Sequence, residues 1–167
     1  SAHGRDGIAW SVVPVPGGRL VGLAVVDGSP WVLIQEPGTA FRLEPTTGHV
    51  QTTVAVGPNA ARLYVAAGAL YVASPPSSEV TRIDPSDRSR VTFSPELPVL
   101  GRVDALGGSA DGLLLSSGSS VERLDPFTGR RIGDVVTGRN FITAVALDGD
   151  RMFLATEDAV MIEARAP

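Results

Sequence analysis

Short apolar segments separated by turn residues occupy most of this chain, and they follow the two-residue period of β-strands. In residues 80–84, Val80, Arg82 and Asp84 fall on one face, whereas Thr81 and Ile83 fall on the other, as in a half-buried strand. No segment shows the 3.6-residue period of a long amphipathic helix, so helical repeats and βαβ folds are not favoured. The pattern predicts an all-β protein.

The apolar segments group into four successive units. We expect their strands at 20–26, 31–35, 40–44 and 50–56; at 62–66, 70–74, 79–84 and 89–93; at 103–109, 113–116, 120–125 and 130–136; and at 142–147, 151–156 and 159–164. Small turn dipeptides join the first two strands of each unit and predict tight hairpins. They are Asp27-Gly28, Ala67-Gly68, Asp111-Gly112 and Asp148-Gly149.

One motif, an arginine, an aliphatic residue, an acid and a proline before a turn, ends the third strand of the first three units. Its copies begin at Arg42, Arg82 and Arg123, which are 40 and 41 residues apart, and residues 161–163 form a degenerate fourth copy. The acid can accept hydrogen bonds from the turn amides, while proline presets φ. Four-stranded units of about 40 residues have the size of β-propeller blades.

The last unit lacks a fourth strand, and the start of the chain offers one. Residues 10–17 align with 51–57, the outer strand of the first unit. We therefore predict a β-propeller of four four-stranded blades, closed by pairing 10–15 beside 159–164, because closure removes exposed strand edges. The alternative is that the chain forms half of an eight-bladed dimeric propeller.

The predicted organisation is a single domain. We expect residues 1–7 to be a disordered, tag or stalk segment and residues 8–167 to form the propeller domain. Its repeats would cover about 18–57, 58–101, 102–140, and 141–167 together with 8–16.

The sequence resembles the YVTN-type and NHL-type bacterial propeller repeats over nearly its whole length. The resemblance rests on Leu70-Tyr71-Val72-Ala73-Ser74 followed by Arg82-Ile83-Asp84-Pro85, with weaker copies at 31–33 and 152–156. These motifs specify blades rather than activities, and such propellers commonly have more blades than this chain supplies. The resemblance implies an extracytoplasmic module of a bacterial envelope or signalling protein that binds a small molecule or a protein.

Composition narrows the classes of partner. All 14 basic residues are arginines, they do not cluster, and the net charge is −4, which argues against nucleic acids and anionic membranes as partners. The chain has no cysteine, so neither disulfides nor thiolate metal sites are available. No apolar stretch reaches 18 residues, so we expect no membrane insertion by this segment.

Candidate ligand residues lie in the loops between units and in the loops that join second to third strands, because propellers commonly bind ligands where these loops meet. They are Arg19, Asn59, Arg62, Arg102, Arg139, Asn140, Glu36, Glu79 and Glu157. One hypothesis is that Arg19, Arg102 and Arg139 surround a pocket for an anionic group. The alternative is surface arginines paired with acids of the same loops, Asp158 among them, which would contribute little.

Other conspicuous residues have structural interpretations. The repeated Arg42, Arg82 and Arg123 are expected to pack their aliphatic stems along a strand and to bond a neighbouring strand or turn acid. The larger aromatic residues are predicted to fill the core and the space between blades; an exposed cluster would instead indicate a sugar or peptide platform. These aromatic residues are Trp10, Trp31, Tyr64, Tyr71 and Phe141.

No motif for catalysis or metal binding emerges. Asp148-Gly149-Asp150 and the pair Asp84 and Asp87 do not match a calcium loop, and only His3 and His49 are available as histidines. Neither a nucleophile elbow nor a phosphate loop occurs, and we find no counterpart to the histidine of streptogramin lyases, which belong to a similar propeller family. We expect no catalytic residues, metal or cofactor.

The functional prediction is a non-catalytic binding or sensor module, monomeric or homodimeric. A scaffold for protein partners is the first alternative, and a lyase- or hydrolase-type propeller enzyme is the second.

Overall fold

Four antiparallel sheets of three or four strands follow one another along the chain after a two-stranded sheet at its start. The computed structural model describes residues 2–3, 9–10, 14–15, 17–95, 103–149, 151–157 and 159–164. Apart from one 3₁₀ turn, η1 (Pro75–Ser77), the regular structure of these residues is β-strand. The predicted all-β class is confirmed.

The sheets are numbered here in chain order. Sheet 1 contains β3 (Leu20–Val26), β4 (Ser29–Ile34), β5 (Thr39–Leu43) and β6 (Val50–Ala55). Sheet 2 contains β7 (Arg62–Ala66), β8 (Ala69–Ser74), β9 (Glu79–Ile83) and β10 (Arg90–Phe93). Sheet 3 contains β11 (Ala105–Ser109), β12 (Gly112–Ser117), β13 (Ser120–Leu124) and β14 (Val136–Thr137). Sheet 4 contains β15 (Ile142–Asp148), β16 (Arg151–Thr156) and β17 (Val160–Ala164).

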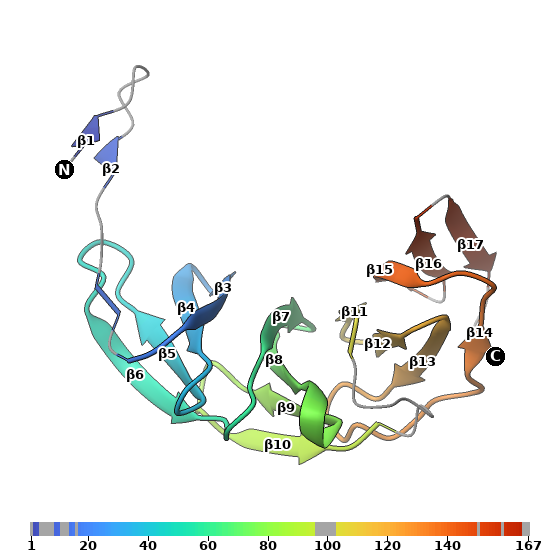
Figure 1. Cartoon of the computed structure of the whole chain (residues 1–167), viewed down its shortest axis with the longest axis horizontal. Coiled ribbons are helices and arrows are strands. Elements are labelled where there is room, and N and C mark those ends of the chain that lie inside the picture. Colours follow the sequence, from blue (N-terminus) through green and yellow to red (C-terminus); the bar gives the residue numbers. More distant parts are fainter. Residues whose placement is uncertain are drawn as a thin grey trace.

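The four sheets stand side by side in an open arc (Figure 1). The first strands of consecutive sheets are neighbours: β3 lies against β7, β7 against β11, and β11 against β15. Sheets 1 and 4 therefore form the two ends of the arc, and each has one face that no other sheet covers.

The predicted closure of the ring is wrong for this structure. Ala9–Trp10 forms β2, which pairs with β1 (Ala2–His3) rather than with β17. Among the described residues, β17 pairs only with β16, and sheet 4 keeps three strands. Two short strands that are close in sequence can pair locally, whereas closure must bring together opposite ends of the arc (Figure 1).

The hairpin predictions are confirmed in two sheets and displaced by one residue in the other two. Asp27 and Gly28 both have positive φ, as a tight type I′ hairpin requires, and the same holds in sheet 2. In sheet 3, Gly112 instead lies within β12, where a Cβ would be 2.6 Å from Nε of Arg123. This glycine serves the close approach of an arginine rather than the turn.

The fourth strand of sheet 3 is shorter than predicted. Of residues 130–136, only Val136 belongs to β14, and Arg131 forms an isolated bridge with Leu124. Gly133 interrupts the segment with a φ of +73°, which is incompatible with a continuous strand.

The core consists of three apolar clusters, one at each junction between consecutive sheets. Trp31 and Leu33 of sheet 1 meet Leu70 and Val72 of sheet 2 in the first cluster. The same strand β8 turns Tyr71 and Ala73 towards sheet 3 in the second cluster, and the third cluster joins sheets 3 and 4. All six residues of β8 are buried, because both faces of an inner sheet are covered.

The repeated arginines form hydrogen bonds within their sheets, and the predicted bond to the turn acid is confirmed for Arg82. Nη2 of Arg42 donates to Oγ of Ser29 at 2.8 Å, and Nη2 of Arg123 donates to the carbonyl of Asp111 at 3.0 Å. Arg82 forms an ion pair with Asp84 at 3.1 Å. These contacts hold the third strands of sheets 1, 2 and 3 to nearby residues of the same sheet.

Candidate functional site

Two sets of loops meet at one edge of sheets 3 and 4. The β12–β13 hairpin of sheet 3 presents Gly118 and Ser119 there. The segment leading into β15 is held against this hairpin, because the amide of Ile142 donates to the carbonyl of Gly118 at 2.8 Å and that of Gly138 donates to Ser119 at 2.7 Å. The backbone therefore fixes the residues between them beside the hairpin.

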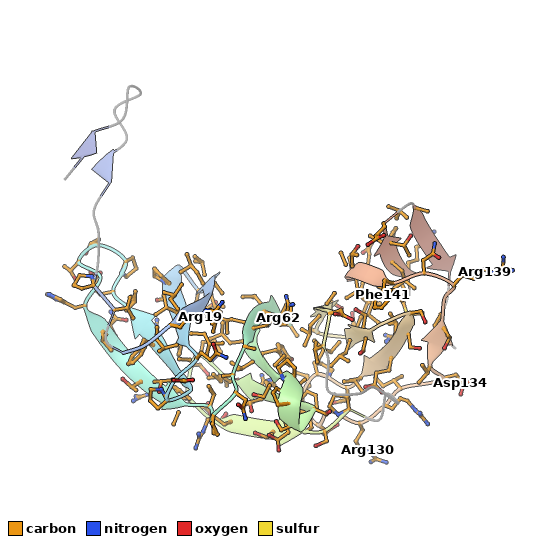
Figure 2. All side chains as sticks on the ribbon, in the orientation of Figure 1. Arg19, Arg62, Arg130, Asp134, Arg139 and Phe141 are labelled. Carbon is orange, nitrogen blue, oxygen red and sulfur yellow. The ribbon has the colours of Figure 1, made fainter. Side chains whose placement is uncertain are left out.

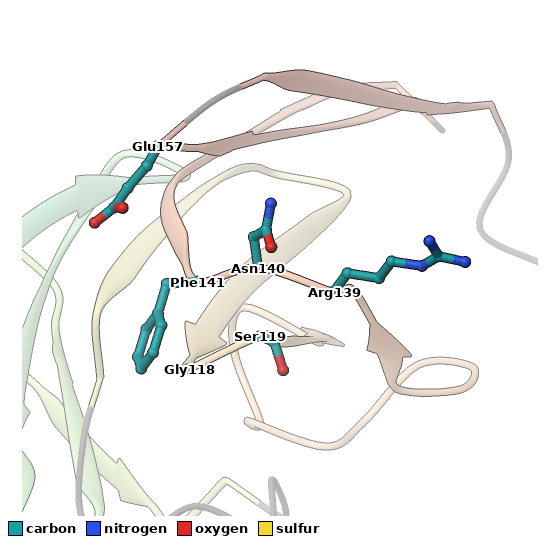
Figure 3. Close-up of a pocket in the computed structure, with 6 residues that line it drawn as sticks. All are labelled: Gly118, Ser119, Arg139, Asn140, Phe141 and Glu157. Carbon is teal, nitrogen blue, oxygen red and sulfur yellow. The ribbon is translucent and has the colours of Figure 1, made fainter.

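A cavity of about 430 Å³ opens between these loops. Its lining comes from both sheets and comprises Gly118, Ser119, Arg139, Asn140, Phe141 and Glu157 (Figure 3). Phe141 and Glu157 lie on one side of Asn140, whereas the guanidinium of Arg139 extends to the other side. This volume lies in the range of small-molecule sites.

The lining offers three kinds of contact. Arg139 provides a cation with several donors, Glu157 provides an acceptor, and the Asn140 amide provides both a donor and an acceptor. The Phe141 side chain is 57% exposed and adds a flat apolar surface. Such a set suits a small polar ligand that also has an apolar face.

A second cavity of about 380 Å³ occupies the corresponding edge between sheets 1 and 2. It is lined by Val21, Ala61, Arg62, Leu63, Tyr64 and Pro75. Burial raises the pKa of Tyr64 above its ordinary value. Arg62 is the charged residue of this lining, which otherwise presents mainly apolar groups.

The structure brings three of the predicted site residues, Arg139, Asn140 and Glu157, around the first cavity and places Arg62 in the second. The other described candidates line neither cavity: Arg19 and Glu36 are exposed on sheet 1, Asn59 lies in the turn before β7, and Glu79 begins β9. Arg102 lies outside the described residues.

The hypothesis of a three-arginine pocket stays a prediction. Arg19 belongs to sheet 1 and Arg139 to the segment before sheet 4, so they lie towards opposite ends of the arc (Figure 2). They share neither cavity.

Phe141 corrects one sequence prediction. We expected core filling, and the structure places it at the rim of the first cavity; Trp31 and Tyr71 are fully buried, as predicted. The β-strand begins only at the next residue, Ile142, which takes the buried position. The sequence did contain a signal for the exposure of Phe141. It directly precedes the buried Ile142, and strand alternation places neighbouring residues on opposite faces of the sheet.

The clearest perturbations of acids belong to the repeated turns rather than to the cavity. Hydrogen bonds from Thr46 and Thr47 lower the pKa of Glu44 to about 2. Bonds from Ser86 lower the pKa of Asp84, and bonds from Thr128 lower that of Asp125. These carboxylates act as acceptors for turn amides.

The described part of the chain contains no group of three histidine, cysteine, aspartate or glutamate side chains that could hold a metal ion. No helix in that part is long and apolar enough to cross a membrane.

No family model matches the sequence, and no curated protein matches it. Solved structures do resemble the fold. The computationally designed Ika4 protein has a TM-score of 0.74 and 14% identity, covering 95% of this chain and 100% of its own. The WD40 repeats of RRP9 have a TM-score of 0.65 and 13% identity, covering 86% of this chain and 50% of theirs.

A third similar structure is the extracellular domain of the putative hybrid two component system BT4673 from B. thetaiotaomicron. It has a TM-score of 0.66 and 18% identity, and the match covers 89% of this chain and 21% of that one. The matches thus cover half or less of the length of the RRP9 and BT4673 chains. WD40 repeats build four-stranded propeller blades, so the fold of this chain is propeller-like.

Proposed function

We propose that the chain is a non-catalytic binding module whose ligand site is the cavity between sheets 3 and 4. The observation that carries this proposal is the gathering of Arg139, Asn140, Phe141 and Glu157 around one opening. These residues come from two loops that the backbone holds together, so the site is formed before a ligand arrives.

The chemistry of the lining favours a saccharide. A sugar ring stacks its apolar face on an aromatic side chain and directs its hydroxyls to amide, carboxylate and guanidinium groups. Phe141 supplies the first contact, and Asn140, Glu157 and Arg139 supply the second. The cavity has room for one or two rings.

We further propose that the module belongs to the extracytoplasmic part of a bacterial envelope or signalling protein. The likeness to an extracellular domain of a putative two component system supports this placement, at the level of the fold. Residues 70–74 and 82–85 support assignment to the YVTN or NHL type of repeat.

A second candidate function is the scaffold, and one observation favours it. The outward faces of sheets 1 and 4 carry exposed apolar side chains, among them Leu23, Val25 and Val160. Exposed apolar surface of this kind marks contact with other protein.

Ligand-observed NMR with glucose and N-acetylglucosamine tests the saccharide site. We expect saturation transfer to at least one of the two sugars, and we expect Phe141→Ala and Glu157→Gln each to weaken its binding by about tenfold. Phe127→Ala is the matched control, because Phe127 is similarly exposed but follows β13, at the opposite edge of the sheet.

Two results would contradict the proposal. Neither sugar receives saturation from the wild-type protein, or Phe127→Ala reduces binding as much as Phe141→Ala does. Circular dichroism of each variant shows whether the fold is retained.

A further inference from the structure

The first strand of every sheet carries one large aliphatic residue three positions before the last pair of its hairpin. These residues are Leu23, Leu63, Leu106 and Val145. Leu63 packs in the cluster shared with sheet 1, Leu106 in the cluster shared with sheet 2, and Val145 in the cluster shared with sheet 3. Leu23 has no preceding sheet and is 66% exposed, against 7% for Leu106.

The proline of the repeated turn is likewise buried in inner sheets and exposed in sheet 1. Pro85 and Pro126 are buried, and the carbonyl of Pro126 accepts a hydrogen bond from Tyr71 of the preceding sheet. Pro45, at the same place in sheet 1, is exposed. Sheet 1 therefore presents two elements that inner sheets use to contact their predecessor.

The outward face of sheet 4 carries a residue that inner sheets use to contact the sheet that follows them. Trp31, Tyr71 and Leu114 occupy one position of the second strand, point to the following sheet and are fully buried. Phe153 holds that position in β16 and is partly exposed. Sheet 4 thus offers an aromatic residue that no following sheet covers.

The first strand of sheet 4 also has a small residue at the position where sheets 1 and 3 have one, whereas sheet 2 has the exposed Arg62 there. Facing the next sheet, sheet 1 has Gly22, where a Cβ would come within 2.5 Å of Cβ of Leu63. Sheet 3 has the buried Ala105 at the same position. Ala144 holds that position in sheet 4 and is exposed.

We propose that the outward face of sheet 1 docks on the outward face of sheet 4 of a second copy of this chain, and that two such junctions close one ring of eight sheets. The surface that joins them consists of Leu23 and Pro45 on one side and Ala144, Ala146 and Phe153 on the other.

A second copy is the fitting occupant for two reasons. Every copy carries both complementary faces, so two open arcs close by a two-fold rotation with both junctions satisfied. The chain also spans 50% of the RRP9 WD40 chain, so two copies amount to one such propeller. The interface is separate from the saccharide site, and either proposal can fail alone.

Sedimentation equilibrium across a dilution series tests the interface. We expect the wild-type chain to form a dimer of twice 17.3 kDa. Leu23→Asp and Phe153→Asp each place a charge in the junction and should raise the dissociation constant at least about 30-fold. Val65→Asp is the control, because Val65 holds the place of Val25 at an inner junction and is 43% exposed.

Three outcomes overturn the inference. The wild-type protein remains at 17.3 kDa at the highest concentration reached, or its mass grows continuously as in an open filament, or Leu23→Asp and Phe153→Asp dimerise like the wild type. Circular dichroism confirms that a monomeric variant is folded. A loss of dimer confined to the two face variants supports the proposed surface.

Discussion

The hydroxyl of Tyr71 in sheet 2 donates a hydrogen bond of 2.9 Å to the backbone carbonyl of Pro126 in the turn of sheet 3. The neighbouring Phe127 lies under the guanidinium of Arg82, 5.1 Å from its ring centre. The turn that ends the third strand of sheet 3 is therefore also a contact to the preceding sheet.

Removing the Tyr71 hydroxyl tests this contact. Tyr71→Phe should lower the free energy of unfolding by about 1–2 kcal/mol, because the buried carbonyl loses its partner. Tyr64→Phe is the control, since in the described part of the chain the Tyr64 hydroxyl forms no hydrogen bond to another sheet, Arg62 being on its own strand, and it should change stability by less than about 0.5 kcal/mol. Equal effects in urea denaturation would contradict the assigned role.

A β-carbon at Gly38 should disrupt sheet 1. It would lie 1.6 Å from the carbonyl oxygen of Gly57, and Gly38 has a φ of +83°. Gly38→Ala should therefore cost more than about 3 kcal/mol or prevent folding. Gly28→Ala has a similar φ of +70° but open space around it, and should cost only about 1 kcal/mol. Thermal unfolding compares the two variants.

Leu106 and Leu23 provide a test of burial at equivalent positions. Leu106→Ala should destabilise the chain by about 2–4 kcal/mol, because it leaves a cavity between sheets 2 and 3. In a protein diluted to monomers, Leu23→Ala should change stability by less than about 0.5 kcal/mol, since this side chain is exposed. Similar losses in urea titrations of both variants would show that Leu23 packs within its own chain.

The turn acids predict how stability depends on pH. The folded-state pKa of Glu44 is about 2, below its ordinary value of 4.5, so its contribution is complete above pH 4.5 and is lost as the pH falls towards 2. The difference in urea midpoint between the wild type and Glu44→Gln should be constant at neutral pH and shrink across that acid range. A difference that does not change with pH would contradict the hydrogen bonds to Thr46 and Thr47.

Much of the fold was predictable because its information is local. Three strands, Leu20–Val26, Arg62–Ala66 and Arg151–Thr156, have the predicted bounds, since alternation and a tight turn specify a hairpin without reference to the rest of the chain. The turn at Gly112 was misplaced by one residue, because the need for glycine there comes from Arg123 across the sheet.

The non-local features were less predictable. Closure depends on whether sheets 1 and 4 meet, and no short motif encodes the angle between successive sheets. The candidate site was predicted in part: loop position indicated Arg139, Asn140 and Glu157, whereas Phe141 and the Gly118–Ser119 hairpin became visible only with the cavity. From sequence alone, a hydrophobic residue next to a strand is predicted to be buried, and only the positions of its neighbours show that it is exposed.

The measurement that tests the assembled ring most directly is a disulfide between its two faces. The chain has no cysteine of its own, so Leu23→Cys and Ala144→Cys can be introduced together. The inner junction places the equivalent positions, Gly22 and Leu63, next to each other, so only a small widening of the junction would bring two cysteines to the Cβ separation of about 3.8 Å that a disulfide requires. Under mild oxidation we predict a covalent dimer with two bonds on a non-reducing gel. Quantitative linkage within one chain, running at the mass of a monomer, or a ladder of polymers would contradict the ring of two copies.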